Sequence, residues 1–361
     1  MKFDRDVIDG HYHIFNWYDR DGNDFYETTK KYADSRNFKA VNLVASTCGA
    51  ARDVSLNIMA AFYKLRYPET YIHGGLIYDT YPVPAVMPEG MDPLTQYQEL
   101  MEIGFDGIKM IETKPDRAKL MERKISDELF EPFFAAMERD KTHVVWHSVD
   151  PETNWDITTI LPVFIQSGWF YGDGTYPTSE ELYQQTFDVL KRHPELNVTF
   201  AHFFFLSRFP QRLEEMFEMY PNAGVDLTPG REMYQAFGEN YEYFRDFFIR
   251  YSDRLLYGTD ANDGKSLEYN NERSDTVFRF LTTDQELHVW DYRFRGLGLD
   301  EETADRILCG NFLRRVSDKP KPINRTALKA YIEKYRHLIR NEQIRAKIDE
   351  ELEKGWELYE V

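Results

Sequence analysis

Two histidines stand one residue apart near the start of the chain, in the stretch VIDGHYHIFN that runs from residue 7 to residue 16. The apolar pair at its start and the Asp-Gly that follows predict a strand ending in a turn. Residues i and i+2 of a strand point to the same side, so His11 and His13 can aim two imidazoles at one point. A metal ion needs such an arrangement. Taken alone, an H-x-H motif is more often a pair of surface or hydrogen-bonded histidines than a metal site.

Three more polar residues follow apolar runs further along the chain. His147 lies in HVVWHS, His202 lies in NVTFAHF and Asp260 lies in RLLYGTDAN. Taken singly, they fit a core histidine, a histidine packed among phenylalanines and a helix-capping aspartate. Together with the first pair they supply four imidazoles and one carboxylate. Three imidazoles and one carboxylate from this set suit a divalent transition metal with room left for water.

Such a set needs a scaffold that brings the ends of distant strands together. Eight short β-rich runs occur along the chain, at 6–11, 39–46, 71–78, 107–111, 143–147, 197–202, 223–228 and 254–260. Segments with helical periodicity lie between them, at 93–103, 127–139, 180–193 and 209–219. Eight strand–helix units predict a (β/α)8 TIM barrel, in which all five polar residues fall at the C-terminal ends of strands, the face that carries the active site of barrel enzymes.

The organisation of the chain favours this barrel as a single domain over residues 1–361. An open doubly wound sheet is the rival, but it usually carries a glycine-rich first turn, and no G-x-G-x-x-G or P-loop motif is present. The long connection at 148–196 leaves room for an extra helix or a lid. The charged segment 320–361 is predicted to form a helical tail that packs outside the barrel or at a subunit contact.

Composition narrows the classes of function. The formal net charge of −18 disfavours nucleic-acid binding, and no apolar run is long enough to span a bilayer. The two cysteines, Cys48 and Cys309, exclude a disulfide framework and favour a reducing, cytoplasmic setting, and the N-terminus lacks a signal peptide. Aromatic residues make up 16% of the chain, which suits an aromatic-lined pocket. We expect a small-molecule substrate and a homodimer.

The ordered set of motifs resembles the amidohydrolase superfamily. DGHYH at residues 9–13, WH at 146–147, AH at 201–202 and GTD at 258–260 carry the resemblance. The branch that it resembles most is the amidohydrolase-related group that includes aminocarboxymuconate semialdehyde decarboxylase. The likeness runs from residue 6 to about residue 315 and includes CGNFLRRV at 309–316, which is similar to the closing segment of that group.

This resemblance implies a role for each residue. His11, His13, His147 and Asp260 would hold one divalent metal ion, zinc or manganese. His202 would act beside it as a general acid and base. Asp260 would serve both as a ligand and as a proton acceptor.

Three further residues are candidates for contact with the substrate. Lys109, in GFDGIKMIE, lies where two-metal members of the superfamily carry a carboxylated lysine; an inward lysine paired with an acid, or a charge that binds an anionic substrate, is the alternative. The KMIETKP stretch has no histidine after this lysine, unlike the branch. Arg231 follows the seventh strand and suits a carboxylate, or a surface salt bridge. Trp169 is placed to roof the pocket, or to pack within its loop.

The sequence therefore predicts a metal-dependent hydrolase that acts on a small carboxylate, lactone or amide. Non-oxidative decarboxylation of an aromatic or unsaturated acid would use the same residues and is the alternative reaction. A barrel that only binds a metal is a third reading, which the general acid–base neighbour His202 disfavours.

Overall fold

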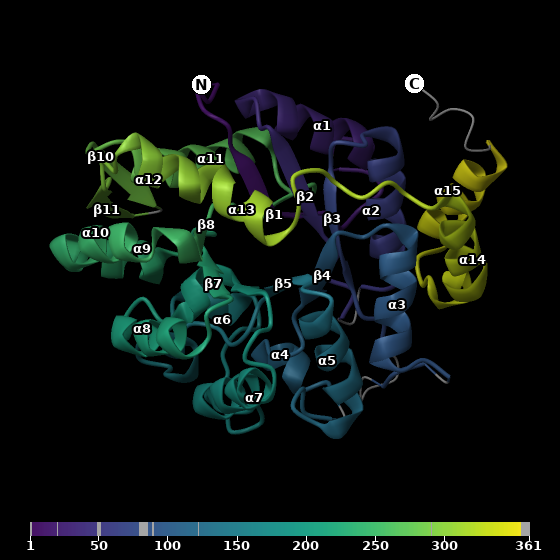
Figure 1. Cartoon of the computed structure of the whole chain (residues 1–361), viewed down its shortest axis with the longest axis horizontal. Helices are drawn as coiled ribbons and strands as arrows, with labels where there is room; N and C mark the ends of the chain where they lie inside the picture. The colour runs from purple at the N-terminus through teal and green to yellow at the C-terminus, as the bar shows by residue number, and fades with distance from the viewer. Residues whose placement is uncertain are drawn as a thin grey trace.

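The computed structural model describes residues 2–19, 21–48, 52–78, 86–88, 90–121, 123–289 and 291–354. Its centre is a parallel sheet that curls on itself, surrounded by helices (Figure 1). The eight main strands follow chain order around the sheet: β1 Ile8–His13, β2 Ala40–Val44, β3 Tyr71–Gly75, β4 Gly107–Met110, β5 His143–Trp146, β6 Val198–Phe200, β7 Ala223–Asp226 and β8 Leu255–Leu256. All eight predicted strands are confirmed.

The sheet closes between its last and first strands. After β8 the chain runs along β1, where Gly10 N–H donates to Tyr257 O at 3.1 Å and Asp260 N–H donates to His11 O at 2.9 Å. The short strand β9 (Ala261–Asn262) then pairs in parallel with β1. This closure makes the fold the predicted TIM barrel and places Asp260 beside the two histidines of β1.

Helices cover the outside of the sheet, and many of them begin at a side-chain cap. The principal ones are α1 Phe25–Arg36, α2 Ser55–Arg66, α3 Pro93–Ile103, α5 Glu131–Arg139, α7 Ser179–Arg192, α8 Pro210–Met219, α10 Tyr241–Arg250 and α11 Leu267–Thr282. Asp92 caps α3 by accepting from Thr95 N–H, and Thr178 forms a full capping box with Glu181 at α7. These caps satisfy amides that a helix leaves without partners. The four predicted helical segments are confirmed.

Two insertions enlarge the connections of the barrel. The connection after β5 holds the short helix α6 (Pro162–Gln166), so the extra helix that the length of 148–196 predicted is present. The connections around β8 hold α9 (Arg231–Glu239) and an antiparallel hairpin of β10 (Glu286–Val289) and β11 (Tyr292–Arg295), which the sequence pattern did not reveal.

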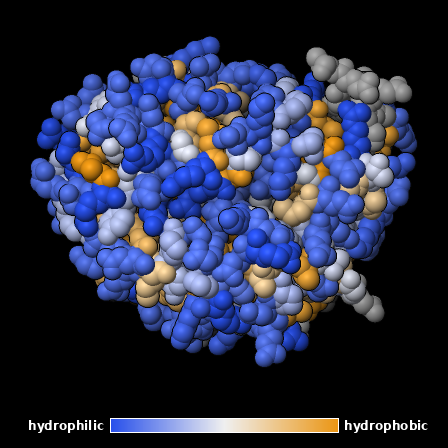
Figure 2. All heavy atoms as spheres, in the orientation of Figure 1, coloured by the Kyte–Doolittle hydropathy of each residue, from blue (hydrophilic) through white to orange (hydrophobic). Residues whose placement is uncertain are grey.

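The C-terminal segment is helical, as expected, and lies against the outside of the barrel. It contains α14 (Arg325–Tyr335) and α15 (Glu342–Glu353), which sit beside α2 and α3 (Figure 1). Asn57 of α2 donates to Tyr331 Oη at 2.9 Å, and Tyr335 Oη–H donates to Glu99 of α3 at 2.5 Å. The face shown in Figure 2 is mostly hydrophilic. Among the described residues, no helix is long and apolar enough to cross a membrane.

A buried chain of hydrogen bonds crosses the barrel interior. Asn42 Nδ2 donates to Gly10 O, so its Oδ1 accepts from His73 Nδ1–H at 2.7 Å. His143 Nδ1–H donates to His73 Nε2 at 2.9 Å, and Thr199 Oγ1–H donates to His143 Nε2 at 2.8 Å. Every ring nitrogen is therefore used with both imidazoles neutral, and a proton added to His73 Nε2 would face the N–H of His143.

We expect this chain to make the fold sensitive to acid. Burial lowers the pKa of His143 to about 3 and the pKa of His73 well below its ordinary value, whereas both rings titrate near 6.5 in the unfolded chain. Their contribution to stability is thus complete above pH ~6.5 and is lost as the pH falls toward 3. Each ring should remove about 2 kcal/mol from the free energy of unfolding between pH 7 and pH 5.

Urea unfolding of the wild type and of His143→Gln at these two pH values measures the effect. The difference in unfolding free energy between the two proteins should shrink by about 2 kcal/mol at pH 5. His337→Gln, at an exposed position, is the control and should leave the pH dependence unchanged. A wild type and a His143 variant with the same pH dependence would contradict the prediction.

Candidate metal centre

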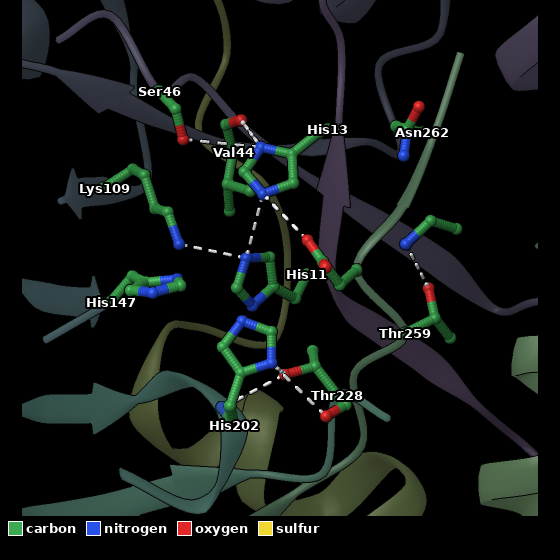
Figure 3. A network of polar contacts seen from close by, with 12 residues as sticks. His11, His13, Val44, Ser46, Lys109, His147, His202, Thr228, Thr259 and Asn262 are labelled. Atoms are coloured by element: carbon green, nitrogen blue, oxygen red, sulfur yellow. Dashed lines mark hydrogen bonds and ion pairs between the residues drawn. The ribbon is translucent and has the colours of Figure 1, made fainter. Parts of the chain in front are cut away.

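His11 and His13 lie on β1 at the C-terminal mouth of the barrel (Figure 3). Asp260, which follows β8, meets them there. Their ligand atoms all lie within 4.8 Å of one another. His11 Nε2 is 3.1 Å from His13 Nε2, and His13 Nε2 is 3.2 Å from Asp260 Oδ1. The spacing expected from the sequence is therefore realised for these three residues.

The partners of the two imidazoles decide which nitrogens carry protons. His11 Nδ1 lies 2.7 Å from Asp226 Oδ2, and His13 Nδ1 lies 3.1 Å from Val44 O. A carboxylate and a carbonyl only accept hydrogen bonds, so both Nδ1 atoms carry the proton and both Nε2 atoms present lone pairs.

These lone pairs and the Asp260 carboxylate face one another without a proton between them. Burial lowers the pKa of His13 to about 3, so the ring is neutral. Burial raises the pKa of Asp260, but the close contact with His13 and the nearby His202 and Arg273 lower it by more, and the net pKa lies well below its ordinary value. Two nitrogen ligands of tetrahedral zinc lie about 3.3 Å apart. The donor set and its spacing thus fit a divalent cation.

Asp226, at the end of β7, organises the centre and was not singled out from the sequence. Its Oδ2 accepts from His11, while its Oδ1 accepts from Thr228 Oγ1–H at 2.7 Å and from His202 N–H at 2.8 Å. Burial raises the pKa of Asp226, but the hydrogen bonds from His11 and Thr228 and the nearby His202 lower it by more, so the carboxylate stays ionised. Its place at the C-terminal end of a predicted strand is the signal that could have identified it.

Asp226 also fixes the tautomer of His202, through the hydroxyl of Thr228. Thr228 has a single hydroxyl proton, which it donates to Asp226, so its oxygen accepts from His202 Nδ1–H at 2.8 Å. The lone pair of His202 Nε2 is then the free one. His202 lies in the left-handed region (φ 55°), as does Asp260 (φ 53°), and both conformations are costly for residues with a side chain. Strain of this kind is concentrated at functional sites.

The structure places His147 beside the group of three rather than within it. Its Nε2 is 3.0 Å from Asp150 Oδ1, and its ring faces that of His202 with centroids 4.8 Å apart. Asp150 also accepts from Tyr171 Oη–H at 2.6 Å and forms an ion pair with Lys114. Because Asp150 occupies Nε2, Nδ1 is the nitrogen left for a metal, and the assignment of His147 as a ligand stays a prediction.

The buried Lys109 reaches the centre from β4. Its Nζ is 2.9 Å from His11 Nε2 (Figure 3). Burial lowers the pKa of Lys109 to about 8, against the opposing effects of Asp226 and Asp260. The amine therefore lies close enough to the cluster for contact with a substrate bound there.

A cavity of about 360 Å³ opens above the centre. Its aromatic walls suit a small, flat molecule; they are Phe15, Phe164, Trp169, Phe205 and Tyr269. Trp169 lines the cavity, with Lys114 Nζ 5.0 Å from its ring centroid, and its contact with a substrate stays a prediction. Arg231 does not line it, because its guanidinium donates to Asp291 at 2.8 Å and to Gln235 at 3.0 Å.

Arg52, in the connection after β2, lines the cavity and was also missed. Its guanidinium stacks over Phe15 at 4.2 Å from the ring centroid, and among the described residues it has no ion pair or hydrogen bond. Burial lowers the pKa of Arg52 to about 10. An arginine that follows a predicted strand on the mouth side of the barrel is a signal that the sequence did contain.

Comparisons with known proteins agree with this geometry. The family model described as Amidohydrolase matches residues 8–314. No curated protein sequence matches the chain.

Solved structures share the fold at low sequence identity. A 2,6-dihydroxybenzoate decarboxylase from Rhizobium has 14% identity and a TM-score of 0.53, covering 88% of this chain and 99% of that one. A 4-oxalomesaconate hydratase from Rhodopseudomonas palustris has 14% identity and a TM-score of 0.51, covering 91% and 98%. The apo form of Metarhizium anisopliae IDCase has 12% identity and a TM-score of 0.51, covering 87% and 97%.

Proposed function

Because the chain belongs to the amidohydrolase family, we propose that it is a metal-dependent hydrolase of a small anionic substrate. His11, His13 and Asp260 would hold one divalent ion, with zinc expected and manganese the alternative, and His147 would complete the set through Nδ1. When bound, such an ion supplies Lewis acidity, which activates water and polarises a substrate carbonyl. The homodimer, the cytoplasmic setting and the single domain stay predictions.

The hydrogen-bonded chain from Asp226 through Thr228 to His202 is the observation that carries the hydrolytic assignment. Asp226 fixes the Thr228 hydroxyl, and this hydroxyl fixes the proton on His202 Nδ1. Nε2 is thus ready to accept a proton from water and to return it to the leaving group, which is the work of a general base that becomes a general acid. Asp260, whose other oxygen lies 3.6 Å from Arg273, offers a second acceptor.

Arg52 supports an anionic substrate. It is a cation on the cavity wall that no described residue neutralises, in a protein whose net charge is −18. The planar guanidinium suits a carboxylate, and Lys109 adds a second positive charge beside the metal cluster. We propose that the substrate carboxylate lies against Arg52 and that its reacting group lies over the three ligands.

Replacing Arg52 by methionine should weaken binding of benzoate, a simple carboxylate probe, by about 10- to 100-fold, the range of a hydrogen-bonded charge. Isothermal titration of the zinc-loaded protein measures this affinity. Arg293→Met, an exposed arginine of the hairpin, is the matched control and should bind benzoate like the wild type. Equal affinities for all three proteins would show that Arg52 does not hold the carboxylate.

Decarboxylation is the second candidate, because the aromatic walls of the cavity suit a flat aromatic acid. In that reaction His202 Nε2 would first take a proton from water or from a hydroxyl of the substrate and would then deliver it to the carbon that loses carbon dioxide. Incubation with lactones, amides and aromatic hydroxy acids in 18O-labelled water separates the two reactions. Label in a product carboxyl group supports hydrolysis, whereas release of carbon dioxide without such label would replace it with decarboxylation.

A further inference from the structure

Glu232 is a charged group in the cavity that the chemistry above does not use. It is the second residue of α9, directly after the connection from β7, and its side chain lines the cavity. Within the described part of the chain it forms no ion pair, and its carboxylate accepts no hydrogen bond from another residue. A carboxylate in this position has hydrogen-bonding capacity to offer a ligand.

The local sequence keeps this carboxylate in the cavity and unpaired. The neighbouring cation, Arg231, turns away to Asp291 and Gln235. Gly230 precedes Arg231 in the sequence. A Cβ at position 230 would lie only 2.6 Å from Glu232 Oε1. Gly230 leaves open the space that the Glu232 carboxylate occupies. Any larger residue would push the carboxylate out of its place.

The surroundings make a bound donor favourable for this group. Burial raises the pKa of Glu232, and the negative charge of Asp150 raises it further, against the effects of its own backbone N–H, Arg208 and Arg231. A poorly solvated carboxylate regains stability when a hydrogen-bond donor reaches it.

The order of the strands sets Glu232 apart from Arg52, with the metal ligands between them. Around the barrel, β7 is followed by β8, β1 and β2. Glu232 follows β7, and Arg52 follows β2. Asp260 follows β8, and the two histidines lie on β1, so a molecule that touches both Arg52 and Glu232 passes over the three ligands.

We propose that Glu232 determines specificity by accepting a hydrogen bond from a hydroxyl or amino group at the end of the substrate remote from its carboxylate. The substrate is then bipolar, with an anionic group at Arg52, a donor at Glu232 and the reacting group between them. This inference rests on the proposed function, because it places the substrate over the metal ligands.

Matched pairs of probes test the donor directly. The probes are 3- and 4-hydroxybenzoate and, as isosteres without a donor, 3- and 4-methylbenzoate, titrated calorimetrically into the zinc-loaded protein. The wild type should bind at least one hydroxybenzoate about 10-fold more tightly than its methyl isostere, the lower range for a hydrogen bond to a charged group. Glu232→Met should reduce this ratio to about 1, and Glu232→Gln, which keeps a neutral acceptor, should give an intermediate ratio.

Glu239→Met is the control, because Glu239 is exposed at the far end of the same helix. It should keep the wild-type ratio. Each ratio is internal to one protein, so a variant of reduced stability still gives an answer. A wild type without any preference, or a Glu232→Met variant that keeps it, would overturn the inference. Metal content is measured on the same samples: zinc-free protein contradicts the proposed function, whereas zinc-loaded protein without the preference contradicts only the role of Glu232.

Discussion

Replacing His11 and His13 together by alanine should lower the bound divalent metal from about one equivalent to none, because two of the three clustered ligands are lost. Hydrolytic activity should disappear with the metal. The fold should persist, since both side chains project from the mouth of the barrel and the packed core does not depend on them. Plasma emission spectroscopy of the purified protein measures the metal, and circular dichroism measures the fold.

The matched control replaces two exposed histidines, His288 and His337, by alanine and should keep the wild-type metal content. His13→Ala alone is a second test, because it leaves the buried pair of His11 and Asp226 intact. A folded double variant that still carries one equivalent of metal would show that the ion is bound elsewhere.

The variant His202→Asn should keep its metal but lose about 100-fold or more in kcat, the usual scale for a general acid and base. The reason is geometric: His202 Nε2 is the free nitrogen at the mouth, and asparagine cannot accept and return a proton there. Thr228→Val, which removes the acceptor that fixes the tautomer, should lose less, about 10-fold, because the imidazole remains. The measurements are kcat on a hydrolysed substrate and metal content.

The pattern of losses separates two roles for His202. Loss of activity with the metal retained fits acid–base chemistry. Loss of metal in step with activity would instead place His202 among the ligands. Unchanged kcat in His202→Asn would remove it from the mechanism altogether.

The strands and the clustering of His11, His13 and Asp260 could be predicted because the positions of these residues in the strand pattern decide where they lie. Apolar runs marked the strands, and the side of a strand on which a residue lies follows from its position. His11, His13 and Asp260 are held by backbone that the barrel closure fixes, as the hydrogen bond from Asp260 N–H to His11 O shows. The position of the backbone alone was therefore enough to predict that these three side chains lie close together.

Other side chains take their direction from partners far away in the sequence. The side chain of Arg231 is oriented by Asp291, which lies 60 residues later in the hairpin that the sequence pattern did not reveal. This ion pair holds the guanidinium outside the cavity. The ring of His147 is oriented by its contact with Asp150. Asp150 is in turn positioned by an ion pair with Lys114 and a hydrogen bond from Tyr171, which lie in two other segments. Such choices depend on tertiary contacts that periodicity does not encode.

The most direct test of the central claim is a crystal structure of the zinc-soaked protein, with anomalous scattering recorded at the zinc absorption edge. Our account predicts one strong anomalous peak within about 2.2 Å of His11 Nε2, His13 Nε2 and an oxygen of Asp260. The same map decides whether His147 joins them through Nδ1. A map with no peak at these three residues, or with zinc only at the surface, would contradict it.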